Sequence, residues 1–282
     1  MSAARHGEAT LLAKEAARGR LCPSAPARLT LASSLGPGSE GRATEARITP
    51  AVRHTCAMQV HVVADATDRD GGYVTERLAE LGATFVELDR DQLPAFAEIE
   101  RPDLVLLLGS GRAAHDRAQR DVVESESVFV RVALALGVPV MGICYGAQLM
   151  ARALGGTSWE ADEPELGWQR IDTTDHDLCP EGPWSQMHSD VFAPGPTSTV
   201  IGTTWQGPQA FIDDAFGARA IAWQFHPEVT PQTFERWVHE GYYGNVNVNE
   251  SALIEQARRH APASRNLAHT LVDSALDYLG VE

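Results

Sequence analysis

Short apolar runs alternate with amphipathic segments between residues 58 and 156, and few architectures accommodate this order. The runs at residues 103–108 and 138–143 are typical of central parallel strands, which are buried on both faces. Strands that alternate with helices form βαβ units and a parallel sheet. We therefore predict an α/β fold with a doubly wound, mostly parallel sheet flanked by helices and a small antiparallel extension within residues 157–225. The predicted strands are 59–64, 83–89, 103–108 and 138–143, and the predicted helices are 73–81, 117–136 and 145–154.

Residues 1–57 differ from the rest of the chain. They are rich in Ala, Arg, Ser, Gly and Pro, lack apolar periodicity and contain more basic than acidic residues. Such a segment buries too little apolar surface to offset its ordering entropy, so we predict disorder. It is either an organellar transit peptide or a translated region upstream of a true start at Met58. We favour the second explanation, because Met58 opens directly onto the first apolar run.

The remaining chain divides into a main domain at residues 58–240 and a C-terminal helical tail at residues 241–282, which we expect to pack on that domain. The tail is too short for an ATP-using domain, and the sequence contains no GxxxxGK[ST] phosphate loop. A role for the tail in binding a partner is an open alternative.

Charge and cysteine spacing exclude several classes of function. A formal net charge of -15 repels phosphate backbones and anionic lipids, so we expect no nucleic-acid or membrane partner. The four cysteines form no CxxC pair, and we predict neither a metal nor a cofactor. No apolar run reaches the roughly 18 residues of a membrane span, so the protein reads as cytoplasmic.

The segment from Gly142 to Gly146 joins an apolar strand directly to an amphipathic helix, with Cys144 at the junction. This is the nucleophile-elbow pattern with sulfur in place of oxygen, in which glycines flank a residue of strained backbone conformation. The start of the helix favours the reactive thiolate. The amide of Tyr145 is placed to meet an oxyanion. Cys144 is therefore a candidate nucleophile, although a cysteine is often only a small buried apolar residue.

Two further segments support a catalytic role for that cysteine. The apolar run at residues 220–225 leads into His226, Pro227 and Glu228, which places a carboxylate where it could orient the imidazole. The loop after residues 103–108 reads Gly109-Ser110-Gly111, and small residues there let backbone amides approach a substrate, although a simple tight turn would look the same.

Together GICYGAQ, WQFHPE and the GSG loop resemble the class I (triad-type) glutamine amidotransferases, over about residues 58–240. Within that family the chain is similar to stand-alone members that look like the amidotransferase domain of GMP synthase. The resemblance implies that Cys144 attacks the glutamine side-chain amide and forms a γ-glutamyl thioester. It implies that His226 is the acid and base, that Glu228 orients it, and that the amides of Gly111 and Tyr145 form the oxyanion hole.

The resemblance also implies a substrate-binding group beside the nucleophile. Gln148 matches a residue that contacts glutamine, and His188, Ser189 and Asp190 belong to a segment beside the substrate pocket; His188 could equally be structural. The chain departs from the best-known synthase subunits at Ala147, where they carry His, at Ser110-Gly111, where they carry Gly-Pro, and in this pocket segment, where they read Ser-His-Gly-Asp. No triad member is affected, but coupling to one known synthase is not implied.

Three functions remain open from the sequence. The first is a glutamine amidotransferase or glutaminase component that passes ammonia to a separate synthase. The second is a γ-glutamyl peptide hydrolase or peptidase that uses the same thioester chemistry. The third is a non-catalytic module that binds a small-molecule ligand, against which the intact set of Cys144, His226 and Glu228 argues. The ammonia acceptor and the oligomeric state are not readable from the sequence.

Overall fold

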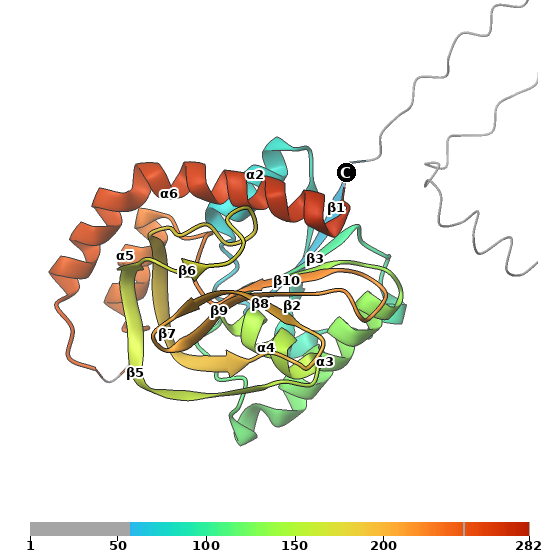
Figure 1. Cartoon of the computed structure of the whole chain (residues 1–282). Coiled ribbons are helices and arrows are strands. Elements are labelled where there is room, and N and C mark those ends of the chain that lie inside the picture. The colour runs from blue at the N-terminus through green and yellow to red at the C-terminus, as the bar shows by residue number, and fades with distance from the viewer. Residues whose placement is uncertain (1–56, 245, 282) are drawn as a thin grey trace, which may run out of the picture. The chain divides into compact units, whose positions relative to one another are not determined.

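The computed structural model describes residues 57–244 and 246–281. The disorder predicted for residues 1–57 therefore falls, up to residue 56, outside the described residues. Eight strands form one mixed sheet in the order β2-β1-β3-β4-β10-β9-β8-β6 (Figure 1). The first five of these strands are parallel, and four of them were predicted. They are β2 (Thr84–Asp89), β1 (Gln59–Ala64), β3 (Leu104–Leu107), β4 (Val140–Ile143) and β10 (Ala220–Trp223).

The rest of the sheet is the predicted antiparallel extension. In this part β9 (Gly207–Asp213), β8 (Thr199–Thr204) and β6 (Asp172–Thr173) pair antiparallel in succession beside β10. A separate two-stranded antiparallel sheet contains β5 (Thr157–Gln169) and β7 (Trp184–Ala193). The predicted fold class is confirmed, but the extension is divided between two sheets, and β10 at its end joins the parallel part.

Each central strand supplies side chains to two separate cores. In β3, Leu104 and Leu106 belong to one apolar cluster, whereas Val105 and Leu107 belong to the other. Successive side chains of a strand point to opposite faces, so a strand covered on both faces is apolar throughout. The two covered faces thus explain why these runs show no alternation.

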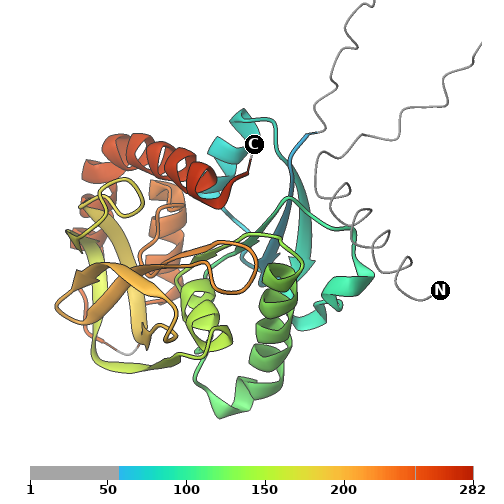
Figure 2. The same ribbon diagram turned by 45° about the vertical axis from the view of Figure 1, so that its right-hand side comes forward.

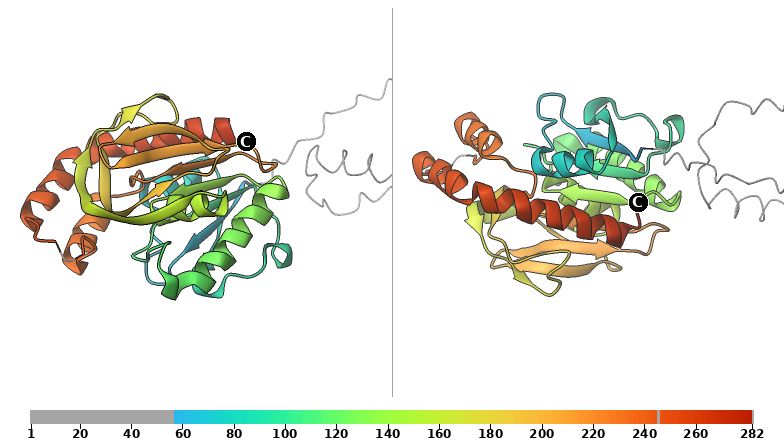
Figure 3. Two further views of the ribbon diagram at one scale, coloured as in Figure 1. Left: turned by 60° about the horizontal axis from the view of Figure 1, so that its bottom comes forward. Right: turned by 90° about the horizontal axis from the view of Figure 1, so that it is seen from above.

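Two pairs of helices cover the faces of the parallel strands. The helices α3 (Arg120–Ala135) and α4 (Tyr145–Ala153) contribute to one core, and α2 (Gly72–Glu80) and α6 (Glu250–Leu279) contribute to the other. The left view of Figure 3 shows α6 on one side of the strands and the green helices on the other. Short 3₁₀ turns occur at Arg90–Gln92, Phe96–Glu98 and Arg117–Gln119. Within the described ranges, no helix is long and apolar enough to cross a membrane.

The C-terminal helix α6 packs on the main sheet. Its buried residues Leu271, Val272 and Ala275 join the core that also contains β1 and β3. The sequence indicates two helical stretches after position 250, and the structure joins them in one helix of 30 residues. Before it, α5 (Pro231–Glu240) forms a third small core with the start of α6, in which Phe234 and Trp237 are buried.

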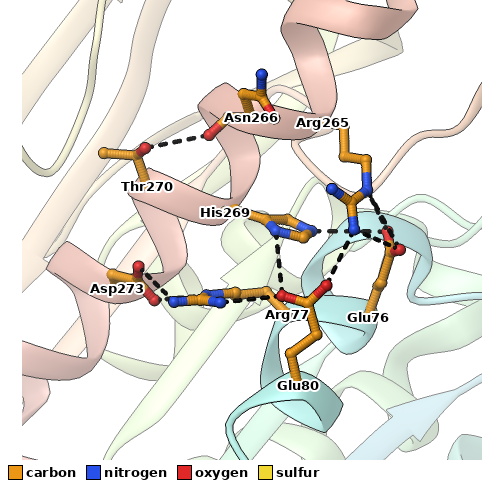
Figure 4. Close-up of polar contacts among 8 residues, drawn as sticks. All are labelled: Glu76, Arg77, Glu80, Arg265, Asn266, His269, Thr270 and Asp273. Carbon is orange, nitrogen blue, oxygen red and sulfur yellow. Dashed lines mark hydrogen bonds and ion pairs between the residues drawn. The ribbon is translucent and has the colours of Figure 1, made fainter.

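Charged side chains also join α6 to α2 (Figure 4). Arg265 lies 2.9 Å from both Glu76 and Glu80, and Arg77 lies 2.8 Å from Asp273. Glu76, Glu80 and His269 are also close enough together to offer three ligand atoms to a metal ion. Arg265 already neutralises both carboxylates, so we interpret the cluster as a surface ion-pair network. Exposed pairs of this kind each contribute about 0–1 kcal/mol to stability.

Candidate active site

Cys144 lies between β4 and α4 in a conformation that is rare for a residue with a side chain. Its φ is 51° and its ψ is -109°, and it is the only non-glycine residue with positive φ in the described part of the chain. Such a backbone costs about 1–3 kcal/mol and is typical of functional sites. The glycines on either side of Cys144 are required because a larger side chain would not fit there. A Cβ on Gly146 would lie 2.4 Å from the Leu107 carbonyl oxygen, and one on Gly142 would lie 2.4 Å from the Met150 sulfur.

The thiol of Cys144 is buried, with 5% of the residue exposed, and is placed at the N-terminus of α4. The side-chain amide of Gln224 donates to its sulfur over 3.7 Å. Unpaired amides at a helix N-terminus and an N–H donor both stabilise a thiolate over a thiol.

His226 and Glu228 form a buried pair. His226 Nδ1 lies 2.7 Å from Glu228 Oε1, while His226 Nε2 has no hydrogen-bond partner among the described residues. Burial by itself lowers the pKa of His226, but the Glu228 carboxylate and the Cys144 sulfur outweigh burial and raise this pKa well above its usual value. The imidazole is thus held ready to carry a proton.

Gly109 shows that the cysteine and the histidine lie close together. A Cβ built on Gly109 would lie 3.6 Å from the Cβ of Cys144 and 3.3 Å from Cε1 of His226. Both side chains therefore contact one point of the loop after β3. Cys144 follows β4, and His226 lies shortly after β10. These two residues, 82 positions apart in the sequence, come close together because β4 and β10 are parallel neighbours.

His226 was expected to follow directly after the end of a strand, but the strand ends earlier. The strand β10 stops at Trp223, and the His226 amide instead donates to the Ser185 carbonyl of β7 over 2.9 Å. The small antiparallel sheet therefore fixes the backbone of the histidine, which sequence periodicity did not reveal.

A pocket opens beside these three side chains. Its lining contains Cys144, His226 and Glu228 together with Asp68, Asp70, Leu108, Gly109, Ser110, Met187, Trp237 and Tyr242. The other predicted site residues are absent from this lining: Gly111, Tyr145, Gln148, His188, Ser189 and Asp190. Within the described residues, no group of three potential metal ligands lies at this pocket.

The predicted oxyanion residues, Gly111 and Tyr145, lie outside the lining of this pocket. Gly111 faces Tyr242, because a Cβ on Gly111 would lie 3.4 Å from that ring, whereas Gly109 faces the cysteine and the histidine. Tyr145 is the first residue of α4, and its buried hydroxyl donates to Glu126 over 2.6 Å.

Arg90 fixes the loop that carries these glycines. Its guanidinium donates to the carbonyl oxygens of Leu108 and Gly109 over 3.1 and 3.3 Å. It also lies 3.1 Å from Glu126 and 3.0 Å from Asp65. The side chain of Arg90 is 1% exposed, so these contacts are made almost without water. A single buried cation thus joins the loop after β3 to the tyrosine of the elbow through Glu126.

The predicted substrate-binding residues form a polar layer behind Cys144. Gln148 donates from Nε2 to Gln224 Oε1 over 3.3 Å and to the Asp190 carbonyl over 3.4 Å. Its Oε1 is buried without a hydrogen-bond partner among the described residues. Ser189 precedes Asp190 in β7 and is half-buried. Burial raises the pKa of Asp190, against the opposing effect of His115 at 3.1 Å.

His188 uses both of its ring nitrogens within the protein. Nδ1 lies 3.0 Å from the Asp190 carbonyl oxygen, and Nε2 lies 3.0 Å from Gln186 Oε1 and 3.3 Å from Glu165 Oε2. Its side chain is 1% exposed. The structure therefore favours the structural alternative for His188.

Two acidic residues and two aromatic residues of the pocket were not found from the sequence. Asp68 accepts hydrogen bonds from Trp237 Nε1 and from Arg236, both over 2.8 Å, and Asp70 accepts one from Thr233 over 2.6 Å. The loop after β1 is thereby joined to α5. Acidic residues after a parallel strand lie at the same sheet edge as the elbow, and this signal could have indicated Asp68 and Asp70.

Comparisons with known proteins show the family of this chain. The family model described as glutamine amidotransferase class-I matches residues 62–242. A GMP synthase (glutamine-hydrolyzing) of Lacticaseibacillus rhamnosus is 30% identical over 177 residues, which are 60% of this chain and 32% of that protein. The corresponding protein of Aeropyrum pernix is 26% identical over 230 residues, which are 78% of this chain and 40% of that protein. The chain thus spans less than half the length of these relatives.

Solved structures show the same fold. A glutamine amidotransferase from Thermotoga maritima superimposes with a TM-score of 0.66 at 24% identity, over 77% of this chain and 97% of that chain. A glutamine amidotransferase from Methylobacillus flagellatus gives a TM-score of 0.65 at 19% identity, over 80% of this chain and 96% of that chain.

Proposed function

Because this chain belongs to the class I glutamine amidotransferases, a family of cysteine-dependent amidohydrolases, we propose that Cys144, His226 and Glu228 are the triad that hydrolyses the side-chain amide of glutamine. The observation that carries the proposal is the strained Cys144 at the start of α4, placed against a histidine whose far nitrogen is held by Glu228. The same arrangement is the general solution for activating a weak nucleophile.

In the proposed reaction, the Cys144 thiolate attacks the amide carbon of glutamine. The carbonyl electron pair moves to oxygen, and the resulting tetrahedral oxyanion is expected to meet the Tyr145 amide and an amide of the loop 109–111. When the C–N bond breaks, protonated His226 gives its proton to the leaving nitrogen, and ammonia departs. Water then attacks the γ-glutamyl thioester while His226 takes its proton, which releases glutamate and restores the thiolate.

The oxyanion loop in this proposal depends on Arg90. Gly111 is the donor that the family resemblance implies, and Gly109 is the loop residue that faces the nucleophile. Because Arg90 holds the carbonyl oxygens of Leu108 and Gly109, it fixes the peptide planes that carry the amides of Gly109 and Ser110.

Substrate recognition is proposed for the polar layer beside the elbow. Gln148 suits this role, because its buried Oε1 has no hydrogen-bond partner among the described residues and can accept from the α-amino group of glutamine. Ser189 and Asp190 flank it in β7, and His188 holds their strand.

The ammonia is proposed to pass to a separate synthase. Support comes from the GMP synthases that this chain resembles over 32% and 40% of their length. In this proposal the acceptor site lies on another polypeptide or on a part of the protein beyond this sequence.

The proposal is tested by incubating the purified chain with glutamine and with γ-glutamyl dipeptides, while ammonia and free glutamate are measured. We expect equal amounts of ammonia and glutamate from glutamine alone. When an extract that contains the acceptor is added, we expect more glutamate and less free ammonia for each glutamate formed. Release of glutamate from the dipeptides but not from glutamine would replace the proposal with a γ-glutamyl hydrolase.

A further inference from the structure

A second hollow lies on the face of the sheet that α3 and α4 cover, both drawn in green in Figure 2. It has a volume of about 710 Å³, within the range of small-molecule binding sites. Most of its lining comes from α3 and the turn before it, with Arg152 of α4 and Gly156 on the other side. We call it the arginine groove. Its lining residues are Ala114, His115, Asp116, Arg117, Arg120, Val123, Glu124, Ser127, Arg131, Arg152 and Gly156.

The charge of the arginine groove opposes that of the whole chain. Four arginines and only two carboxylates of the described residues line it, although the chain carries 38 acidic against 23 basic residues. One of these carboxylates, Glu124, already pairs with Arg131 at 2.9 Å. The other, Asp116, accepts a hydrogen bond from the Ala118 amide in the turn before α3.

Three of the arginines lack an acidic partner among the described residues. Within residues 57–244 and 246–281, the guanidinium groups of Arg117, Arg120 and Arg152 take part in no ion pair or hydrogen bond, whereas exposed arginines elsewhere, such as Arg170 and Arg258, do pair with carboxylates. Cations gathered around one hollow repel one another, and a bound anion would relieve this repulsion.

The other lining residues indicate how a ligand is recognised. Among the described residues, no aromatic ring of Phe, Tyr or Trp lines the groove, and Ala114 and Val123 are its only apolar side chains, so it offers little surface for stacking a ring. Ser127 lines it with 3% of its surface exposed and supplies a hydroxyl group. Recognition therefore depends on charge and on hydrogen-bond donors.

We propose that the arginine groove binds a small polyanion that carries at least two phosphate or carboxylate groups. The planar fork of a guanidinium matches the oxygens of either group in a bidentate manner. The unpaired arginines come from the turn before α3, from α3 and from α4, so each can meet a different anionic group of one molecule. A single ion would satisfy only part of this set.

The arginine groove is separate from the pocket around Cys144, since the two share no lining residue in the described part of the chain. His115 connects the groove to the polar layer that contains Gln148, because it lines the groove and lies 3.1 Å from Asp190, whose carbonyl accepts from Gln148. Because binding is measured directly, the proposal stands or fails independently of the glutaminase activity.

The test is isothermal titration calorimetry of the full chain with pyrophosphate and, separately, with citrate. We expect saturable binding of at least one of them. The variant Arg120→Ala/Arg152→Ala should weaken that binding by about tenfold for each charge-assisted hydrogen bond that the substitutions remove. The control Arg170→Ala/Arg258→Ala removes the same charge from exposed sites outside the groove, and should bind as the wild type does.

The two probes separate the two anion chemistries. Tighter binding of pyrophosphate identifies a phosphate ligand, and tighter binding of citrate identifies a polycarboxylate. Absence of saturable binding of either probe by the folded wild type would overturn the proposal, as would equal affinities in the groove variant and the control. Thermal melting of all variants verifies that they are folded, and Arg117→Ala serves as a second groove variant should the double substitution not fold.

Discussion

The described residues contain two buried histidine–glutamate pairs, and they differ in whether the histidine keeps a ring nitrogen without a partner. His226 gives Nδ1 to Glu228 and keeps Nε2 without a partner among the described residues, beside the cysteine. His188 approaches Glu165 with Nε2 and the Asp190 carbonyl with Nδ1, so both of its nitrogens are occupied. In our proposal the same residue types form a proton-transfer site in one place and a structural contact in the other. The difference comes from one open nitrogen.

Replacement of the two histidines gives the largest expected contrast. His226→Ala should lower kcat by about 10²–10⁴-fold, the usual contribution of general acid–base catalysis, with a small change in melting temperature. His188→Ala should lower kcat by less than about tenfold and destabilise the fold by about 1–3 kcal/mol, because Glu165 and Gln186 lose a buried partner. Ammonia release and urea unfolding measure the two effects. Comparable losses of kcat in the two variants would erase the distinction.

Replacement of Glu228 should lower kcat more than replacement of Glu165, but this contrast should be smaller than that between the two histidines. Glu228→Gln should lower kcat by roughly 10–100-fold, because it loosens the orientation of His226 without removing the base. Glu165→Gln should leave kcat within about threefold, since its carboxylate bonds Gln209 and His188 rather than a catalytic group. Steady-state assays with glutamine test both variants. A kcat for Glu165→Gln below that of Glu228→Gln would reverse the assignment.

Gln224 tests whether the polar layer also contributes to catalysis, because its side chain contacts the Cys144 sulfur. Gln224→Leu removes the 3.7 Å donor to the Cys144 sulfur and leaves a side chain of similar size. We expect kcat to fall by about tenfold, one weak hydrogen bond to a charged group, while KM stays within about twofold. Alkylation of the Cys144 sulfur at a fixed pH should also be slower in this variant, because the sulfur has lost a hydrogen-bond donor. An unchanged alkylation rate would remove the proposed role.

The smallest expected effect is on stability against pH. The folded-state pKa of His226 is raised above its unfolded value of 6.5, chiefly because Glu228 and Cys144 outweigh burial. The stabilisation by the protonated imidazole is therefore fully present below pH 6.5, and is lost as pH rises through the raised pKa. In Glu228→Gln this dependence should shrink. Urea unfolding of both proteins from about pH 6 to about pH 9 measures it; parallel curves would show that the pair does not hold the proton.

Much of the fold follows from local sequence pattern. The apolar runs that form β3 and β4 needed no knowledge of distant residues, because burial on both faces leaves no polar position in such a strand. The small antiparallel sheet could not be predicted in the same way. Its register pairs Glu165 with His188 across 23 positions, and that pairing depends on side chains that only meet in the folded chain.

The site shows the same division. The elbow and the His226-Pro227-Glu228 segment are continuous stretches, so the sequence predicts the three residues that the structure brings to one pocket. Arg90 and Trp237 reach the site through contacts between distant segments, and no local pattern marks them. The sequence predicted a role for the loop after β3. The backbone conformation of the loop, which the sequence does not reveal, makes Gly109 rather than Gly111 face the nucleophile.

The most direct test compares the two described cysteines. Cys144 and Cys179 are both buried and neither forms a disulfide. Cys144 lines the pocket that contains His226, whereas Cys179 is absent from its lining and burial raises the pKa of the Cys179 thiol to about 12. Ammonia release from glutamine should vanish in Cys144→Ala, with a loss of at least about 10³-fold, and persist within about threefold in Cys179→Ala. Turnover by Cys144→Ala at more than about a tenth of the wild-type rate, in protein that melts as the wild type does, would contradict the account.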